Sequence, residues 1–559
     1  MTRAAIVTCA SIVAVTVTFA AFAWQRRWIS DDGLIVVRIA EQIESGHGPV
    51  INRFERAEAN TSALWPWLVA AAGELGDLSV AAVVLGGLCA VAGLLVALDA
   101  TRRWQRARGC RAPLVPGGAW IVLGMFPFWD YATAGLETGL VTLWIGASWW
   151  LLVALRAPAP PRRQLVTAIA LGLGLLVRPD LAPVVALFLV AAHRLVRPTR
   201  RRAACYAAAA LALPLAYEVF RAGYYGALVP LPALAKATTG AHWSHGLHYL
   251  AHFVVPYALW LPLGVLAALL VLGRRGVTGP DRTLVAAPIV AGLVLALYVV
   301  RIGGDFMHGR MLIAPALLVV LPALVVPLSR RSAPAIALLA AWCAFAIATM
   351  PSYAYAGFDW SSDWDERDTY VRYTENEHPI HADDFVSHHA AALLYQQAVD
   401  DHAPPLVISD IAGLNVAMRR DVDASVVMVG GQLGTAGEAI PLDGIVADIA
   451  GLASPLGARI TPTFPGRIGH EKQLPWAWVL AQFADPRWDA AQPFERAATV
   501  SEIRAARHAL TCGELAELLA SAREPLTAAR FWDNLTGAWR RTWLEIPSDP
   551  IEAERAFCR

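Results

Sequence analysis

Two adjacent carboxylates, Asp31 and Asp32, stand directly after the first long apolar stretch of the chain. Charged side chains beside a membrane span are costly unless they face water or a functional cavity. A carboxylate held in such a place can act as a general base and take a proton from a hydroxyl group. The pair therefore predicts a catalytic base at residue 31 or 32, and the sequence does not separate the two.

Two other interpretations of this pair stay open. A helix is expected over residues 32–45, because apolar residues recur there near helical spacing, and an aspartate at its start could simply be the N-cap. Paired carboxylates could also hold a divalent cation instead of acting as a free base. The sequence thus leaves a metal requirement open and names no certain cofactor.

A second charged cluster lies between two apolar segments and runs from Arg301 to Arg310, with Asp305 and His308 inside it. Its glycines permit tight backbone geometry and close approach of a phosphate. Arginine offers a bidentate fork to phosphate, and lysine offers a point charge. The cluster predicts a phosphate site, and a loop whose arginines meet lipid headgroups is the alternative.

Two further cations could join that phosphate site, namely Lys236 and Arg178. The segment Arg178-Pro179-Asp180 could equally be a helix-breaking turn with an internal ion pair. Transfer of a glycosyl unit from a lipid phosphate needs such cations to steady the departing phosphate and a carboxylate to deprotonate the acceptor. The two charged regions together fit that chemistry.

The composition indicates a polytopic membrane protein. Of the 559 residues, 57% are hydrophobic and 16% are charged, against roughly 45 to 50% and about 25% in soluble globules. Stretches of suitable length predict about eleven transmembrane helices, at residues 4–24, 77–100, 114–129, 137–155, 164–178, 181–196, 203–221, 249–272, 283–301, 311–328 and 333–350. The formal net charge of +1 gives no indication of a nucleic-acid partner.

Short arginine-rich loops recur at every second connection, around residues 102–111, 156–163, 194–202, 274–282 and 330–331. Such loops are cytoplasmic by the positive-inside rule. The N-terminus is therefore expected in the cytoplasm of a plasma-membrane protein, and Asp31 and Asp32 are expected on the outer side. Everything after Pro351 is expected outside as well.

The character of the chain changes after residue 350, which predicts a transmembrane domain over 1–350 and an extracytoplasmic α/β or α+β domain over 351–559. Strands are expected near residues 405–410, 424–429 and 444–449, and helices over 386–401, 499–511, 513–523 and 528–545. Cys512 and Cys558 both lie in this domain, where an oxidising compartment would permit a disulfide. The sequence leaves open whether they are bonded.

Several stretches resemble the GT-C superfamily of polyprenyl-phosphate-dependent glycosyltransferases, and within it the terminal β-(1→2)-arabinofuranosyltransferases of mycobacterial and corynebacterial cell walls. They are Ile29-Ser-Asp-Asp-Gly33, Gly303-Gly-Asp-Phe-Met-His-Gly-Arg310, Asp448-Ile-Ala-Gly-Leu-Ala-Ser-Pro455 and Pro465-Gly-Arg-Ile-Gly-His-Glu-Lys472. The resemblance covers nearly the whole chain. It implies a GT-C-like fold with the catalytic aspartate at Asp31 or Asp32.

The resemblance also implies the reaction and its partners. The donor would be decaprenylphosphoryl-arabinofuranose, and the acceptor would be the arabinan of arabinogalactan and lipoarabinomannan, with inversion at the anomeric carbon. Candidate acceptor-binding residues in the last third are Trp360, Trp364, Arg467, His470, Lys472 and Trp476. The alternatives are a transferase of another polyprenyl-phosphate sugar, such as mannose, and a non-enzymatic membrane scaffold or motor-associated regulator. The oligomeric state is left open.

Overall fold

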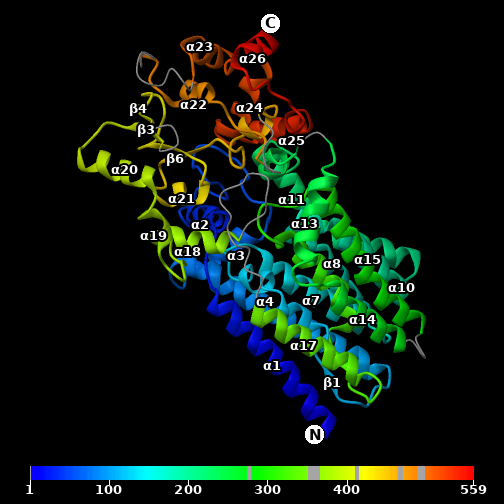
Figure 1. Ribbon diagram of the computed structural model, residues 1–559. Helices are drawn as coiled ribbons and strands as arrows, with labels where there is room; N and C mark the ends of the chain where they lie inside the picture. Colours follow the sequence, from blue (N-terminus) through cyan, green and yellow to red (C-terminus); the bar gives the residue numbers. More distant parts are fainter. Residues whose placement is uncertain are drawn as a thin grey trace. The chain divides into compact units, whose positions relative to one another are not determined.

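The computed structural model describes the chain except for a few segments. The described residues are 2–237, 240–273, 278–349, 365–409, 414–463, 470–487 and 498–558. They form two compact units, each assembled from three parts of the chain (Figure 1). The first unit comprises Met1–Trp28, Ala82–Leu215 and Ala241–Thr369, and the second comprises Ile29–Ala81, Ala216–Gly240 and Tyr370–Arg559. The division expected at residue 350 stays a prediction.

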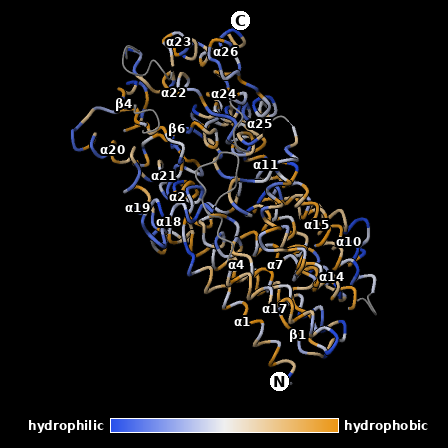
Figure 2. The backbone as a smooth tube through the Cα atoms, in the orientation of Figure 1, coloured by the Kyte–Doolittle hydropathy of each residue, from blue (hydrophilic) through white to orange (hydrophobic). Residues whose placement is uncertain are grey.

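Five helices of the described chain are long and apolar enough to cross a membrane. They are α1 (Arg3–Gln25), α4 (Leu78–Ala107), η1 with α10 (Pro179–Leu181 and Ala182–Val196), α11 (Arg200–Tyr225) and α15 (Gly279–Ile302). Shorter apolar helical segments are α7 (Thr138–Ala154), α14 (Trp260–Leu272), η2 with α16 and η3 (Arg310–Leu312, Ile313–Val320 and Leu321–Ala323) and α17 (Ala333–Thr349). Apolar residues dominate these helices in Figure 2. The protein is thus a multi-pass helical membrane protein, whereas its orientation and the number eleven stay predictions.

Several of the expected spans are not single helices, and two of them show the cause. The stretch 249–272 contains the end of α13 (Trp243–Val254) and α14, with Pro256 between them and Ala258 in the left-handed region at φ +47°. The stretch 114–129 contains β1 (Leu114–Val115), α5 (Ala119–Gly124) and most of α6 (Pro127–Asp130). Proline lacks the amide hydrogen that a helix interior needs, which explains why each stretch is interrupted.

Close contact between α4 and α7 illustrates how small residues pack the first unit. Gly86 and Gly93 lie on α4, and Gly139 and Gly146 lie on α7 with the same seven-residue spacing. A Cβ atom on Gly139 would overlap the carbonyl of Gly86, and one on Gly146 would overlap that of Gly93. Small residues let helix backbones approach closely where lipid supplies no hydrophobic driving force between helices.

The remaining elements of the first unit are short. They are α8 (Pro161–Gly172), α9 (Gly174–Val177) and β2 (Val326–Pro327), which pairs antiparallel with β1; α18 (Glu366–Thr374) crosses the boundary between the units. In the second unit, α2 (Asp31–Glu44) matches the helix expected over 32–45 and confirms that prediction.

A mixed four-stranded sheet forms the centre of the second unit, in the order β4-β3-β5-β6. Its strands are β3 (Leu406–Ser409), β4 (Leu414–Ala417), β5 (Val427–Gly430) and β6 (Ile445–Asp448), of which β4 is antiparallel to β3 and the others are parallel. Side chains alternate between the two faces of a strand. Met428 accordingly packs with Ile35 and Ile39 of α2, whereas Val427 and Val429 pack with Trp478. The three expected strands are confirmed.

The second unit contains further helical segments. They are α3 (Trp65–Gly73), α12 (Leu231–Ala235), α19 (Ala382–Val386), α20 (Ala390–Asp400), α21 (Leu433–Glu438), η4 (Gly457–Arg459), α22 (Trp476–Phe483), α23 (Val500–Ala509), α24 (Gly513–Arg523), α25 (Ala528–Thr542) and α26 (Pro550–Phe557). The four helices expected in this region correspond to α20, α23, α24 and α25. A disulfide joins Cys512 to Cys558 and links α24 to α26, which settles the pairing that the sequence left open.

Candidate active site

The aspartate pair forms the first turn of α2. Ser30 is the N-cap, and its Oγ accepts a hydrogen bond from the Gly33 amide at 3.0 Å. The expectation that an aspartate caps this helix is therefore wrong, because the serine hydroxyl satisfies the free amide. Asp31 and Asp32 instead occupy positions where the helix dipole favours negative charge.

The carboxylate of Asp31 is held by the start of α21. Its Oδ1 accepts hydrogen bonds from the amide and the Oγ1 of Thr435, both at 2.8 Å, and its Oδ2 accepts one from the Gly434 amide at 3.2 Å. A Cβ atom on Gly434 would overlap the backbone oxygen of Asp31. Only glycine permits this approach, so α21 grips both the side chain and the backbone of Asp31.

Burial changes the acidity of Asp31. Removal from water raises its pKa to about 6, and the neighbouring charge of Asp32 acts in the same direction. The hydrogen bonds from Thr435 and Gly434 oppose this rise because they stabilise the charged form. Asp31 is thus a buried acid that three neutral donors orient.

Asp32 differs from its neighbour in exposure, since Asp31 is buried and Asp32 is only half-buried. Successive helical side chains point about 100° apart, and the Gly434 and Thr435 donors of α21 bond the Asp31 carboxylate. The structure thereby separates two residues that the sequence could not. The carboxylate of Asp31 is held by α21, and the side chain of Asp32 is partly exposed to solvent.

Arg38 anchors the middle of α2. Its buried guanidinium donates hydrogen bonds to the carbonyls of Ile51, Gly437, Ile440, Pro441 and Gly444. Burial lowers its pKa from the ordinary arginine value. Sequence reasoning missed this role, although an arginine within the apolar run 34–40 was a signal of a buried, satisfied charge.

Asn52 supports the same region by pairing with β6. Its side-chain Nδ2 donates to the Val446 carbonyl at 3.0 Å, and its Oδ1 accepts from the Val446 amide at 2.9 Å. Asp448, at the end of β6, accepts hydrogen bonds from the amides of Ala450 and Ala453. The Asp448–Pro455 stretch that carried the resemblance is thus a turn organised by its first carboxylate.

The predicted acceptor-binding residues differ in their contacts and burial. The Lys472 ammonium donates to the carbonyls of Leu234 and Ala458 at 2.8 and 2.9 Å, which ties α12 to η4. Trp476 begins α22 and packs against the sheet core, and His470 is half-buried. Trp360, Trp364 and Arg467 lie outside the described residues.

In the first unit, Asp305 and Arg310 form an ion pair. The Arg310 Nε and Nη2 lie 2.7 and 2.5 Å from Asp305 Oδ2, and both side chains are largely buried. Gly304, at φ +80°, brings the backbone against the Tyr249 ring, where a Cβ atom would clash. The glycines of this run therefore allow the tight loop that carries the pair.

His308 is fully buried beside this pair. Its ring centroid lies 5.5 Å from that of Phe126 and 6.3 Å from that of Tyr257. Arg301, in the last turn of α15, has an exposed side chain, and Lys236, at the end of α12 in the second unit, is exposed as well. Their phosphate-binding roles stay predictions.

Arg178 is already engaged by two carboxylates. It donates to both oxygens of Asp180 at 2.9 Å and also bonds Glu137. The turn with an internal ion pair, which the sequence offered as an alternative, is therefore present. A phosphate role for Arg178 remains a prediction.

A charged network that the sequence did not predict surrounds Arg26 in the first unit. Arg26 bonds Asp130 and lies 3.7 Å from Asp365, and the Trp28 indole donates to the Asp130 carbonyl at 2.9 Å. Burial, with the nearby charge of Asp130, raises the pKa of Asp365 to about 6. The Arg26-Arg27 pair directly after the first span was the available signal.

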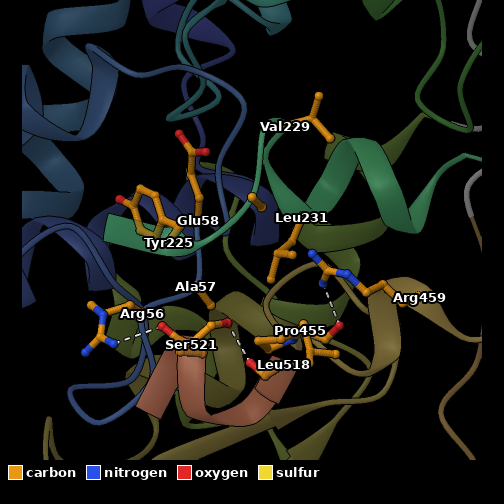
Figure 3. A pocket seen from close by; sticks show the side chains of 12 residues that line it. Arg56, Ala57, Glu58, Tyr225, Val229, Leu231, Pro455, Arg459, Leu518 and Ser521 are labelled. Atoms are coloured by element: carbon orange, nitrogen blue, oxygen red, sulfur yellow. Dashed lines mark hydrogen bonds between the residues drawn. The ribbon is translucent and has the colours of Figure 1, made fainter. Parts of the chain in front are cut away.

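A small cavity lies in the second unit, with an empty volume of about 290 Å³ including its open mouth (Figure 3). Arg56 donates to the carbonyls of Tyr224 and Ser521, and Arg459 donates to those of Pro455 and Arg541. Burial lowers the pKa of Arg459 to about 9. The two arginines that line the cavity therefore already bond backbone carbonyls. The bonds of Arg56 connect the end of α11 to α24.

Among the described residues, one cluster of three side chains is close enough to share a metal ion, namely His508, Cys512 and Cys558. Its two cysteines are joined by the disulfide. The thiolates that a metal would need are therefore not available there in the oxidised protein.

Comparison with known proteins identifies the family. Residues 388–555 match the AftB family C-terminal domain. The terminal β-(1→2)-arabinofuranosyltransferase of Mycobacterium tuberculosis is 34% identical, over 97% of this chain and 95% of the relative. The chain belongs to this arabinofuranosyltransferase family. It is therefore a glycosyltransferase.

A second member of the arabinofuranosyltransferase family, from Corynebacterium glutamicum, is also 34% identical, over 96% of this chain and 85% of the relative. A solved structure with a weaker likeness is ArnT from Cupriavidus metallidurans bound to undecaprenyl phosphate. It has 14% identity and a TM-score of 0.44, and the match covers 96% of this chain and 88% of that one. This likeness is too distant to assign a ligand.

Proposed function

We propose that the protein transfers arabinofuranose from decaprenylphosphoryl-arabinofuranose to the non-reducing ends of cell-wall arabinan, in arabinogalactan and lipoarabinomannan. The names of both relatives support the sugar and the terminal β-(1→2) link. The observation that carries the mechanism is the position of Asp31 and Asp32 in the first turn of α2, where α21 holds the Asp31 carboxylate. A carboxylate placed beside the acceptor can take the proton of its hydroxyl group.

In the proposed reaction Asp32 is the catalytic base and Asp31 is its positioning residue. Asp32 takes the proton of the acceptor hydroxyl as the hydroxyl oxygen bonds to the anomeric carbon. The bond from that carbon to the phosphate oxygen breaks, and polyprenyl phosphate leaves. The partial exposure of Asp32 and the three donors on Asp31 support this division of roles.

Donor binding is proposed for the run from Arg301 to Arg310. Asp305 orients the Arg310 guanidinium, and a guanidinium of fixed direction suits a phosphate oxygen. His308, Lys236 and Arg178 are proposed as further phosphate ligands. A single displacement of this type inverts the anomeric carbon, so donor and product should have opposite configurations.

The acceptor is proposed to bind residues 351–559 on the outer side of the plasma membrane, with the N-terminus in the cytoplasm. The Cys512–Cys558 disulfide supports this side, because disulfides persist in oxidising compartments. His470, Lys472 and Trp476 are the acceptor candidates among the residues that the structure describes.

The test uses membranes that carry wild type, Asp31→Asn or Asp32→Asn, with labelled decaprenylphosphoryl-arabinose and a synthetic arabinan acceptor. Asp32→Asn should lower transfer by about 10² to 10⁴-fold, the usual contribution of a general base, with an unchanged melting temperature. Asp31→Asn should lower both transfer and melting temperature. If both variants transfer as well as wild type, the base assignment is wrong.

Two controls complete the experiment. A decaprenylphosphoryl-mannose donor tests the alternative sugar, and transfer of mannose at the arabinose rate would contradict the proposed donor. A chelator tests whether the aspartate pair acts through a divalent cation. Transfer that persists in the chelator would leave the free base as the mechanism.

A further inference from the structure

Helix α25 exposes a row of three tryptophans on the second unit. Trp532, Trp539 and Trp543 are 62%, 66% and 58% exposed. At about 100° per residue these positions fall within an arc of roughly 40°, so the indoles share one side of the helix. Trp539 and Trp543 also pack edge to face, with ring centroids 5.9 Å apart. The three indoles thus form an aromatic stripe along this side of the helix.

Two polar side chains of α25, Asn534 and Arg541, point the opposite way. Asn534 is buried and donates to the Ser521 carbonyl at 3.0 Å. Arg541 is buried too, and it bonds the Gly226 carbonyl at 3.1 Å and Glu517 at 2.9 Å. A helix beside water normally turns its apolar face inward. Here the aromatic face is the outer one, which marks an interaction surface.

The packing of α25 on α11 indicates what covers the tryptophan face. The helix packs on the end of α11, where a Cβ atom on Gly223 would overlap the Phe531 ring, and Thr542 Oγ1 accepts from the Leu228 amide at 2.9 Å. One turn before this contact, the apolar side chain of Val219 is 51% exposed. The apolar surface of α11 therefore extends to within a turn of α25.

Helix α11 is a candidate span whose apolar window is only 6% buried in the protein. Its 26 residues extend about 39 Å, against a hydrocarbon core of about 30 Å. The end of α11 consequently reaches the headgroup layer if the helix crosses the bilayer. Tryptophan is enriched at that depth, because its ring is apolar and its N–H finds polar partners there.

Charges beside the stripe are mixed. Arg540 and Asp533 are both exposed and lie on the same flank of the helix, about 80 to 100° from Trp532. Arg530, by contrast, is paired with Glu517 and Glu524. The flank therefore carries no excess of positive charge, and binding would depend on the indoles more than on anionic lipid.

We propose that α25 lies along the membrane surface with Trp532, Trp539 and Trp543 in the headgroup layer, so that the second unit is held against the bilayer. A glycan platform is the main competitor, since indoles also stack on sugars. Sugar sites combine such rings with side chains that bond the hydroxyl groups. Because exposed Asp533 and Arg540 flank the stripe and could bond such hydroxyls, the test includes soluble arabinan as the competing occupant.

The experiment places the photo-crosslinking residue p-benzoylphenylalanine at Trp539 of the full chain in nanodiscs of phosphatidylglycerol and phosphatidylcholine. Arg504, exposed on α23 of the same unit, receives it as the matched control. Adducts are identified by mass spectrometry after illumination, with and without soluble arabinan. Lipid adducts should be several-fold more abundant at 539 than at 504 and unaffected by arabinan. Equal yields, arabinan adducts or adducts with a second copy would overturn the proposal.

A second measurement protects the test against local misfolding. The variant with Trp532, Trp539 and Trp543 all changed to serine is compared with wild type in nanodiscs of lipid brominated near the headgroup. The emission lost in the variant should be quenched more strongly than the emission of the tryptophans that remain. Equal quenching in a variant of unchanged melting temperature would contradict an interfacial position. Neither measurement depends on sugar transfer.

Discussion

The two units stabilise a buried carboxylate in different ways. In the first unit, Asp305 is paired with the guanidinium of Arg310. In the second, Asp31 is held by two backbone amides and a hydroxyl, and its pKa is raised to about 6. An ion pair commits the acid to its charged form, whereas neutral donors orient it and leave it able to titrate near neutrality. The ion pair in the first unit therefore suits a structural role, whereas the Asp31 carboxyl group in the second unit can gain or lose a proton near neutral pH.

Asp305→Asn tests the first half of the comparison and should have the largest effect on stability. It leaves the Arg310 guanidinium largely buried without the charge of its partner, which typically costs about 3 to 5 kcal/mol. The melting temperature in detergent measures this loss. Asp533→Asn, an exposed change on α25, is the control and should stay within about 0.5 kcal/mol. Equal melting temperatures of the two variants would contradict the ion-pair argument.

A pH series tests the second half. The folded pKa of Asp31 is raised from 3.8 to about 6, so the native state binds more protons than the unfolded state between those values. Its contribution to stability is therefore present below pH 4 and is lost as the pH rises to about 6, by up to about 3 kcal/mol.

Asp31→Asn lacks this titration. The difference in melting temperature between wild type and this variant should shrink as the pH rises from 4 to 6 and stay constant above. Asp365 titrates in the same direction but is present in both proteins, so it cancels. A difference that grows with pH would show that the Asp31 pKa is depressed instead.

Gly434→Ala should break the grip on Asp31 from the backbone side. The added Cβ overlaps the Asp31 carbonyl oxygen, and overpacking of this kind costs about 1 to 3 kcal/mol. Transfer should fall together with the melting temperature, because α2 is displaced. Gly264→Ala is the matched control, since a Cβ there meets nothing within 4 Å. Similar behaviour of the two variants would count against the close approach.

Thr435→Val should have the smallest effect. It keeps the size of the side chain and the amide that bonds Asp31, and it removes one hydroxyl donor. Loss of one bond to a buried acceptor costs roughly 1 to 2 kcal/mol. Thr435→Ser restores the hydroxyl and should recover most of the stability. Failure of serine to do so would mean that the methyl group, not the hydroxyl, matters at this position.

Local patterns in the sequence predicted local structure well. The helix over 32–45, the buried strands and the helices of the last third follow from periodicity within about a dozen residues, and each is present. The spans broken by Pro256 and by the prolines near 116 and 127 show where hydropathy alone was too coarse. Composition recognises an apolar stretch but not whether its backbone stays helical.

The chemistry of the aspartate pair could not be predicted in the same way. Asp31 meets Thr435 across 404 positions of sequence, and Arg38 meets Gly437 across 399. The sequence around Gly434 and Thr435 has no pattern that marks these residues as hydrogen-bond partners of a distant aspartate. The sequence thus identified the two carboxylates as candidates, and tertiary contacts show that their surroundings differ.

The pairing of Asn52 with Val446 has a consequence for biosynthesis. Its side-chain amide completes both hydrogen bonds of a residue on β6, the edge strand of the sheet, and so takes the place of a neighbouring strand. The ribosome makes Asn52 and Asp31 nearly 400 residues before their partners, a separation of 394 for Asn52. Asp31 therefore lacks its hydrogen bonds to Gly434 and Thr435 until the last third of the chain has been synthesised. A chain truncated before α21 would contain Asp31 without the donors that orient its carboxylate.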